Sequence, residues 1–270
     1  MTIFVSVVGG LGNQLFTIFA GIAYSLEHKV PFKLVSTPNK RELYYNTFLA
    51  TLKGFVLPDT REVRDRNSYI EPNFHYNKIP YDKDFVLNGY WQSYKYFTDH
   101  LDSIMRLTKI NMWKEAVKDK YNYREDSISI HFRIGDYTLY PNHHNILDID
   151  YYISALNQII ELDSSVKRVI VFGEACDSNK ILERVNILKE KFDELEFEVI
   201  NHTIPDYSQM MIMSNCKHNI IANSSFSLMA AYLNMNKDKN VLYPSKWFGP
   251  KNMDKNTNDI PEDGWFRISV

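Results

Sequence analysis

The sequence predicts an α/β protein built on parallel sheets. In the second half, short β-rich runs alternate four times with segments of helical spacing, which is typical of a doubly wound sheet. The first half opens with a strand, a glycine-rich turn and a helix. A chain of 270 residues, 44% of them apolar and 24% charged, is long enough for two lobes with separate cores.

The first half contains two clear strand and helix units. The β-rich run 3–8 leads through GGLGN into a segment with apolar residues on one helical face. Strand character returns at 30–36 and at 85–93, and residues 94–107 have the spacing of a helix. We therefore expect an α/β arrangement here too.

The second half supplies the regular alternation. The predicted strands are 127–134, 168–174, 197–201, 218–223 and 240–245, and the predicted helices are 151–162, 178–192, 206–217 and 225–234. A charged helical segment at 111–126 could join two lobes. We place the boundary there, which gives an N-terminal lobe of residues 1–124 and a C-terminal lobe of residues 125–270.

Composition excludes several classes of protein. A net charge of -2 and a pI near 6.5 provide no positive field for nucleic acid, so any anion site must use a few residues. No run approaches the roughly 20 apolar residues of a transmembrane helix, and the start of the chain lacks a basic leader. We expect a cytoplasmic protein with no integral membrane segment, either free or peripheral to a membrane.

No metal site is predicted. Cys176 and Cys216 lie far apart, and the histidines show no HExxH grouping. Asp148 and Asp150 form a DxD pair, but Asp150 directly precedes a helical run and is better interpreted as its N-cap. His143 and the next residue, His144, are interpreted as solvated loop residues.

The stretch SISIHFRIGDY predicts an anion site at the end of a strand. The period of two places His131 and Arg133 on one face, and Gly135 then allows a sharp turn before Asp136. The arginine offers a planar donor fork to a phosphate, and the histidine can add a donor or act as a base. A surface ion pair beside a core histidine is the structural alternative.

A second candidate anion site follows the predicted strand 218–223. Asn223, Ser224, Ser225 and Phe226 lead into a helix, and Ser224 or Ser225 is expected to be its N-cap. The free N–H groups and the dipole of a helix N-terminus favour an anion. The alternative is a capped helix without a ligand.

The GGLGNQ stretch predicts a turn that lets a ligand approach the backbone. A dinucleotide fingerprint is not favoured, because Leu15 stands where the third glycine of GxGxxG belongs. Gly10 and Gly12 leave space, while Asn13 and Gln14 offer amide side chains at a helix start. A plain turn between a strand and a helix is the structural alternative.

Four motifs in order resemble the α-1,2-fucosyltransferases of glycosyltransferase family eleven. They are GGLGNQLF at 9–16, GYWQSYKYF at 89–97, HFRIGDY at 131–137 and CKHNIIANSSFSLMAAYL at 216–233. The resemblance covers nearly the whole chain. It implies a GT-B type fold of two facing Rossmann-like lobes, with the acceptor bound on the N-terminal side and the nucleotide-sugar donor on the C-terminal side.

The resemblance also implies an activity and residue roles. It implies inverting transfer of L-fucose from GDP-fucose to a galactoside hydroxyl, with a glycan acceptor and without a required metal or other cofactor. Arg133 would neutralise the donor pyrophosphate with His131 beside it, NSSFS would complete the phosphate cradle, and Asp136 is the candidate base. Glu174 could accept hydrogen bonds from the guanine, and the loop of Gly10, Gly12, Asn13 and Gln14 would line the cleft.

Three departures from the family pattern keep alternatives open. Ile134 replaces a second arginine, FGEA replaces an acidic FSDD-like element, and LMA replaces WWG in the last motif. A different nucleotide-deoxyhexose donor with the same mechanism is therefore one alternative. A non-catalytic module that binds a sugar nucleotide is another.

Overall fold

The computed structural model describes residues 2–36, 42–58, 60–121 and 126–270. Two compact units are present, one of Met1–Trp113 with Lys255–Ile260 and one of Lys114–Asp254 with Pro261–Val270. Below they are unit 1 and unit 2. The division falls inside the helix α3 (Ile110–Tyr121). The boundary expected between residues 124 and 125 lies outside the described residues.

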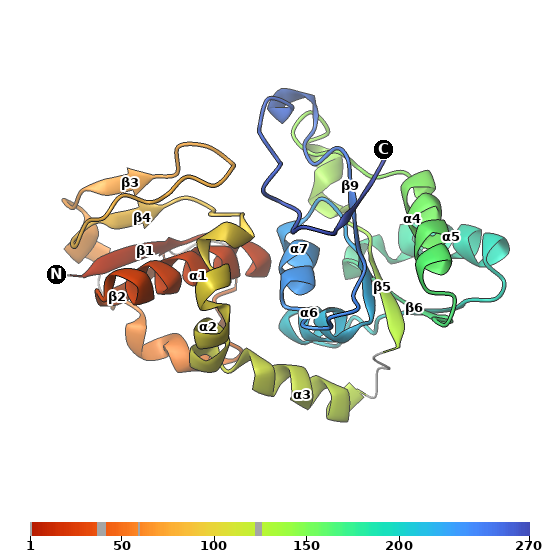
Figure 1. Ribbon diagram of the computed structural model, residues 1–270, viewed down its shortest axis with the longest axis horizontal. Helices are drawn as coiled ribbons and strands as arrows, with labels where there is room; N and C mark the ends of the chain where they lie inside the picture. The colour runs from red at the N-terminus through yellow and green to blue at the C-terminus, as the bar shows by residue number, and fades with distance from the viewer. Residues whose placement is uncertain (1, 37–41, 59, 122–125) are drawn as a thin grey trace. The chain divides into compact units, whose positions relative to one another are not determined.

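Unit 1 is built on a parallel sheet whose described strands have the order β2-β1-β4-β3 (Figure 1). Helix α1 packs against β1, and Gly21 permits this because a Cβ there would overlap Val5. The described elements are β1 (Ile3–Val7), α1 (Leu11–His28), β2 (Phe32–Ser36), η1 (Tyr44–Asn46), η2 (Ala50–Phe55), η3 (Thr60–Val63), β3 (Ser68–Ile70), β4 (Val86–Asn88), η4 (Tyr94–Tyr96), η5 (Thr98–His100) and α2 (Leu101–Thr108).

Two features of unit 1 differ from the prediction. Residues 94–107 are not one helix, because two 3₁₀ turns, η4 and η5, precede α2. The intervening Phe97, with φ of −140° and ψ of −8°, is neither helical nor extended. The short edge strand β3 was not predicted. Its three residues are exposed or half-buried, so they show no apolar alternation.

Unit 2 contains a larger parallel sheet with the order β10-β9-β8-β5-β6-β7. The predicted alternation of strands and helices is confirmed. The described elements are β5 (Ser127–His131), η6 (Gly135–Leu139), α4 (Ile149–Leu162), β6 (Arg168–Phe172), η7 (Ala175–Asp177), α5 (Ser178–Lys191), β7 (Glu196–Val199), α6 (Asp206–Asn215), β8 (His218–Ile220), α7 (Ser225–Tyr232), β9 (Val241–Pro244), η8 (Pro250–Asn252) and β10 (Phe266–Ile268).

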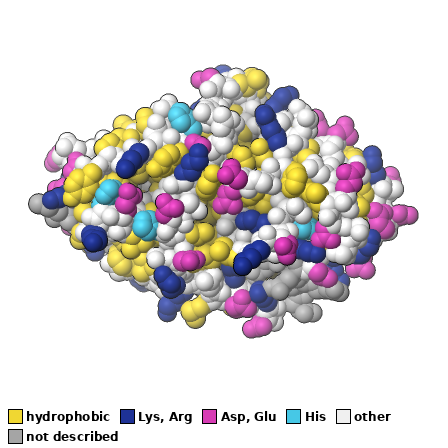
Figure 2. Space-filling view, in the orientation of Figure 1, with side chains coloured by type: hydrophobic (Ala, Val, Ile, Leu, Met, Phe, Trp, Pro, Cys, Tyr) yellow, Lys and Arg dark blue, Asp and Glu magenta, His cyan; other side chains and the backbone are white. Residues whose placement is uncertain are grey.

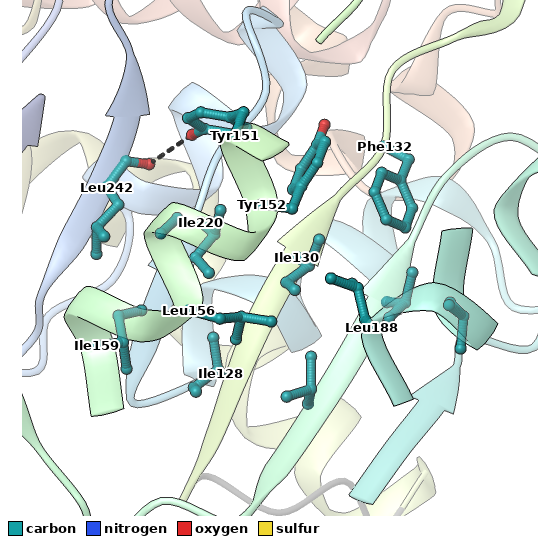
Figure 3. Close-up of a cluster of buried hydrophobic side chains, with 14 of the residues drawn as sticks. Ile128, Ile130, Phe132, Tyr151, Tyr152, Leu156, Ile159, Leu188, Ile220 and Leu242 are labelled. Carbon is teal, nitrogen blue, oxygen red and sulfur yellow. Dashed lines mark hydrogen bonds between the residues drawn. The ribbon is translucent and has the colours of Figure 1, made fainter. Parts of the chain in front are cut away.

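Helices cover both faces of this sheet. In Figure 1, α4 and α5 lie on one side of the strands β5 and β6, and α6 and α7 lie on the other. The core beneath α4 and α5 contains Ile128, Ile130, Phe132 and Ile134, which are alternate residues of the β5 segment. Figure 3 shows the first three of them in this core. His131 and Arg133 consequently belong to the opposite face of the sheet, as the sequence predicted.

Buried tyrosines of α4 join the core to the strand ends. The Tyr151 hydroxyl donates to the carbonyl oxygens of Ile221 at 2.6 Å and of Leu242 at 3.2 Å, the second drawn in Figure 3.

Asp148, and not Asp150 as expected, occupies the N-cap position of α4. Asp150 lies in the first turn, where its charge still suits the helix dipole.

The surface carries both signs of charge. On the face shown in Figure 2, Lys and Arg side chains alternate with Asp and Glu side chains without one sign dominating.

Among the described residues, no helix combines the length and the apolar character needed to span a bilayer.

Candidate active site

The candidate residues of unit 2 gather where the chain changes direction across the sheet. From β5 the chain adds β6 and β7 on one side, and then β8, β9 and β10 on the other. Ligands of open α/β sheets bind beyond the carboxyl ends of the strands at such a switch point. Arg133 follows β5 and Asn223 follows β8, and these two strands are hydrogen-bonded neighbours.

Arg133 is the centre of the cluster. Its two terminal nitrogens form ion pairs with Asp136 and Glu174, and its side chain is 16% exposed. The guanidinium carbon lies 4.8 Å from the centroid of the Tyr137 ring. Burial alone would lower the pKa of Arg133, but Glu174, Tyr137 and Asp136 raise it overall. A positive, planar donor group is therefore held in one orientation.

A tight turn after β5 brings the acidic residues to Arg133. Gly135 has a φ of +23°, and a Cβ atom at this position would overlap the Glu174 carboxylate. The Gly135 N–H donates to Asp177 Oδ2 at 2.6 Å. Asp177 is buried and was missed by the sequence analysis, although it follows Glu174 closely in the stretch FGEACD after β6.

His131 lies beneath this surface layer. It is 5% exposed, and its ring centroid is 5.5 Å from that of Phe226. Burial, aided by the positive charge of Arg133, lowers the pKa of His131 to about 3. The imidazole is therefore neutral near pH 7, and its buried Nδ1 has no hydrogen-bond partner among the described residues.

Tyr137 connects the Arg133 turn to the loop after β8. Its hydroxyl donates to the Asn223 carbonyl oxygen at 2.9 Å. Its ring also stacks on His144, with centroids 4.1 Å apart and an interplanar angle of 14°. The expectation that His144 is merely solvated was therefore wrong, because the loop folds back over the tyrosine.

The segment Asn223–Phe226 is held by side chains as predicted for a helix start. The Asn223 amide nitrogen donates to the carbonyl oxygens of Asn145 at 2.8 Å and Trp247 at 2.9 Å. Ser224 is the N-cap of α7, and its hydroxyl accepts from the Phe226 N–H at 3.4 Å. Ser225 and Phe226 are half-buried in the first turn of α7. The sequence prediction that Ser224 or Ser225 caps this helix is confirmed for Ser224.

One group of side chains in this site has the spacing of a cation site. The ligand atoms of Glu174, Cys176 and Asp177 lie within 4.8 Å of one another. Glu174, however, pairs with Arg133, and Asp177 accepts the Gly135 N–H. Two of the three residues therefore already have partners within the protein.

The GGLGNQ residues lie in unit 1, between β1 and the first turn of α1. Gly10 is the N-cap of α1, and Gly12, Asn13 and Gln14 belong to its first turn. The Gln14 amide nitrogen donates to Gly9 O at 3.0 Å and Glu42 O at 2.8 Å. The half-buried Asn13 accepts a hydrogen bond from Gln92 Nε2 at 2.6 Å.

Sequence comparisons match this chain to a family model and to named relatives. The family model described as Glycosyl transferase family 11 matches residues 31–269. The O-antigen biosynthesis glycosyltransferase WbnK of Escherichia coli is 29% identical, with 93% of this chain and 96% of the relative covered. The Alpha-1,2-colitosyltransferase of Escherichia coli is 28% identical, with 96% of each covered.

Solved structures show the same fold at lower sequence identity. The fucosyltransferase NodZ from Bradyrhizobium matches with a TM-score of 0.50 and 14% identity, covering 86% of this chain and 93% of NodZ. A NodZ alpha-1,6-fucosyltransferase co-crystallised with GDP matches equally, with 92% of that chain covered. The expected α/β fold of GT-B type with parallel sheets is confirmed.

The buried neutral state of His131 predicts a pH-dependent stability. The folded pKa is depressed, so the unfolded chain binds this proton first as pH falls below about 6.5, and the folded state is destabilised. This contribution lowers the free energy of unfolding by about 2 kcal/mol from pH 7 to pH 5. Between pH 7 and pH 5, the free energy of unfolding of His131→Gln should therefore fall by about 2 kcal/mol less than that of the wild type. Urea unfolding at both pH values measures this difference.

His143→Gln, which replaces an exposed histidine, is the matched control. Its loss of unfolding free energy between pH 7 and pH 5 should equal that of the wild type. Equal losses of stability in the wild type and in His131→Gln would contradict the assignment of a buried neutral imidazole.

Proposed function

Because this chain belongs to glycosyl transferase family 11, we propose that it moves L-fucose from GDP-fucose to a galactoside hydroxyl in α-1,2 linkage. The chain is a glycosyltransferase, and the finer assignment concerns donor, acceptor and linkage. An α-1,2 linkage is named for one relative, and GDP was co-crystallised with the structurally similar NodZ. Both support the proposal.

One observation carries the mechanism: Arg133 and the N-terminus of α7 follow neighbouring strands at the switch point of unit 2. A departing nucleoside diphosphate gains negative charge as its bond to the sugar breaks. Donors already fixed around that charge lower the barrier, because they need no reorganisation during the reaction. We assign the pyrophosphate to the guanidinium of Arg133 and to the first N–H groups of α7.

When the donor binds, Arg133 must exchange a carboxylate partner for the diphosphate. Asp136 and Glu174 occupy both ends of its fork, and a diphosphate beside them would meet like charge. Their side chains are 41% and 40% exposed, so either carboxylate can swing into solvent at little cost. Glu174, once released, can accept hydrogen bonds from the nucleotide base.

His131 and the α7 cap complete the proposed cradle. A neutral imidazole under the cluster avoids a second buried cation next to Arg133, and Phe226 holds its ring. Ser224 fixes the start of α7, and Ser225 in the first turn can add a hydroxyl donor to a phosphate oxygen. Cationic and dipolar groups thus supply the charge stabilisation for which other transferases use a metal ion, so we propose a metal-independent reaction.

Asp136 is the proposed general base of an inverting transfer. Its carboxylate takes the proton of the acceptor hydroxyl while the oxygen of that hydroxyl bonds to the anomeric carbon. On the opposite face, the bond from this carbon to the diphosphate oxygen breaks, and the diphosphate leaves with the electron pair. Asp136 gives up its contact with Arg133 when the donor binds and then turns toward the acceptor hydroxyl.

A second candidate donor is another activated deoxyhexose used by the same mechanism. The relative named for colitosyl transfer favours it, as do the FGEA and LMA departures at 172–175 and 228–230. The phosphate-binding residues would act identically, because they contact the diphosphate and not the sugar.

Replacing Arg133 tests the phosphate assignment. Arg133→Ala should lower kcat with GDP-fucose and a β-galactoside by about 100-fold to 1,000-fold, because one preorganised donor to the leaving group is lost. Arg168→Ala is the matched control, since Arg168 begins β6 at the opposite end of a neighbouring strand and pairs with Glu196. Undiminished turnover in Arg133→Ala would refute the assigned role.

Replacing Asp136 separates a base from an orienting residue. Asp136→Asn should lower kcat by about 100-fold or more while GDP affinity, measured by calorimetry, stays equal or increases. Glu174→Gln serves as the comparison, because Glu174 holds the other end of the same guanidinium. If both variants lose the same activity, or if Asp136→Asn loses GDP affinity, Asp136 only orients Arg133.

The donor nucleotide can be identified by thermal shift. GDP should raise the melting temperature more than UDP, dTDP or ADP at equal concentration, because ligands that bind only the folded state stabilise it. GDP-fucose and a second GDP-deoxyhexose are then compared in transfer assays. A clear preference for UDP or dTDP removes fucose from consideration. Nucleotide binding without transfer or donor hydrolysis would favour the non-catalytic alternative.

A further inference from the structure

Unit 1 has a switch point of its own, which the mechanism above does not use. Its described sheet has the order β2-β1-β4-β3 with every pair parallel, so the chain leaves β1 for β2 on one side and reaches β4 from β3 on the other. Two loops follow the carboxyl ends of the neighbours β1 and β4, residues 8–10 and 89–93. Open parallel sheets bind ligands at this position.

The loop after β4 is held in an unusual conformation by Glu71. Both carboxylate oxygens of Glu71 accept backbone N–H groups, from Tyr90 at 2.7 Å and from Trp91 at 3.1 Å. Trp91 has a left-handed φ of +55°, which is uncommon for a bulky residue. Gly89 allows this packing, because a Cβ there would overlap the Glu71 side chain. Such strain persists where the surrounding contacts enforce it.

This conformation turns two adjacent aromatic residues in opposite directions. Trp91 is 0% exposed and packs against Tyr96 and Tyr69, with ring centroids 5.3 and 6.1 Å away. Tyr90, the preceding residue, is 49% exposed, and Ile70 at the end of β3 is 67% exposed. The buried indole anchors the loop, and the loop presents the phenol ring to solvent.

The two loops are tied together by amide side chains. Gln92 Nε2 donates to Asn13 Oδ1 at 2.6 Å, and both residues are half-buried. Asn13 folds back over Gly9, whose φ of +78° and lack of a side chain permit this contact. The remaining donors and acceptors of such amides can serve a ligand in a fixed geometry.

The chemistry of these loops differs from that around Arg133. Neither Gly9–Asn13 nor Gly89–Gln92 contains a charged residue, and the adjacent Glu71 is acidic. Neither loop supplies a cation to a phosphate, and the positive charge of Lys255 nearby acts on the Glu71 carboxylate. An exposed aromatic ring can cover the apolar face of a pyranose, while fixed amides pair with its hydroxyl groups.

We propose that the loops after β1 and β4 of unit 1 form a carbohydrate subsite, in which the Tyr90 ring stacks on a neutral sugar and Gln92 and Asn13 bind its hydroxyls. The ligand class rests on the proposed function, for which this sugar is the galactoside acceptor. Glu71 is a positioning residue that maintains the loop.

The test uses the full chain and two independent readouts. Saturation-transfer NMR with lactose and methyl β-D-galactoside measures sugar binding without catalysis, and transfer kinetics measure the acceptor KM. Tyr90→Ala and Gln92→Leu should each raise the acceptor KM at least about tenfold and abolish the NMR signal. GDP affinity and melting temperature should match the wild type in both variants. Tyr81→Ala, which removes another exposed tyrosine of unit 1, should behave as wild type.

The outcomes distinguish the subsite from the transferase assignment. Transfer by the wild type, with the acceptor KM and NMR signals of both variants within about twofold of it, would overturn the subsite and leave the function standing. Sugar binding that is lost in Tyr90→Ala, with no transfer from any nucleotide sugar, would support the subsite and overturn the function. Neither binding nor transfer by the wild type would overturn both.

Discussion

Parallel strand direction is the constraint on which the rest of this structure depends. Because every described strand pair is parallel, the carboxyl ends of each sheet collect on one edge. The change of direction between β5 and β8 then leaves that edge open at one place. Arg133 and Asn223 are 90 positions apart in the chain, yet they follow neighbouring strands for this reason alone.

The cluster built on that edge is a preorganised arrangement of opposite charges. Arg133 forms ion pairs at both ends of its fork with half-exposed carboxylates. Tyr137 contacts its guanidinium from one face and is itself stacked on His144. The exposed partners can leave at low energetic cost, but the buried Asp177 holds the turn through the Gly135 N–H. The guanidinium can therefore change partners without losing its position.

The switch points of the two units carry different side chains, although both sheets are parallel. In unit 2 the open edge carries a cation, acids and a helix N-terminus, which suit a diphosphate. In unit 1 the corresponding edge carries amides, a tyrosine and a strained turn locked by Glu71, which suit an uncharged polyol. Each edge is open because of strand order, and each is specified by the few side chains that follow the strands.

Local sequence determined the alternation of strands and helices, the position of Arg133 beyond a strand, the face shared with His131 and the cap at Ser224, because periodicity and turn chemistry act over a few residues. The pairing of Arg133 with Glu174, the bond from Tyr137 to Asn223, the role of Asp177 and the clamp of Glu71 on the Trp91 turn were decided by tertiary structure alone. These contacts join residues 20 to 86 positions apart. They depend on strand order and register, which no local pattern encodes.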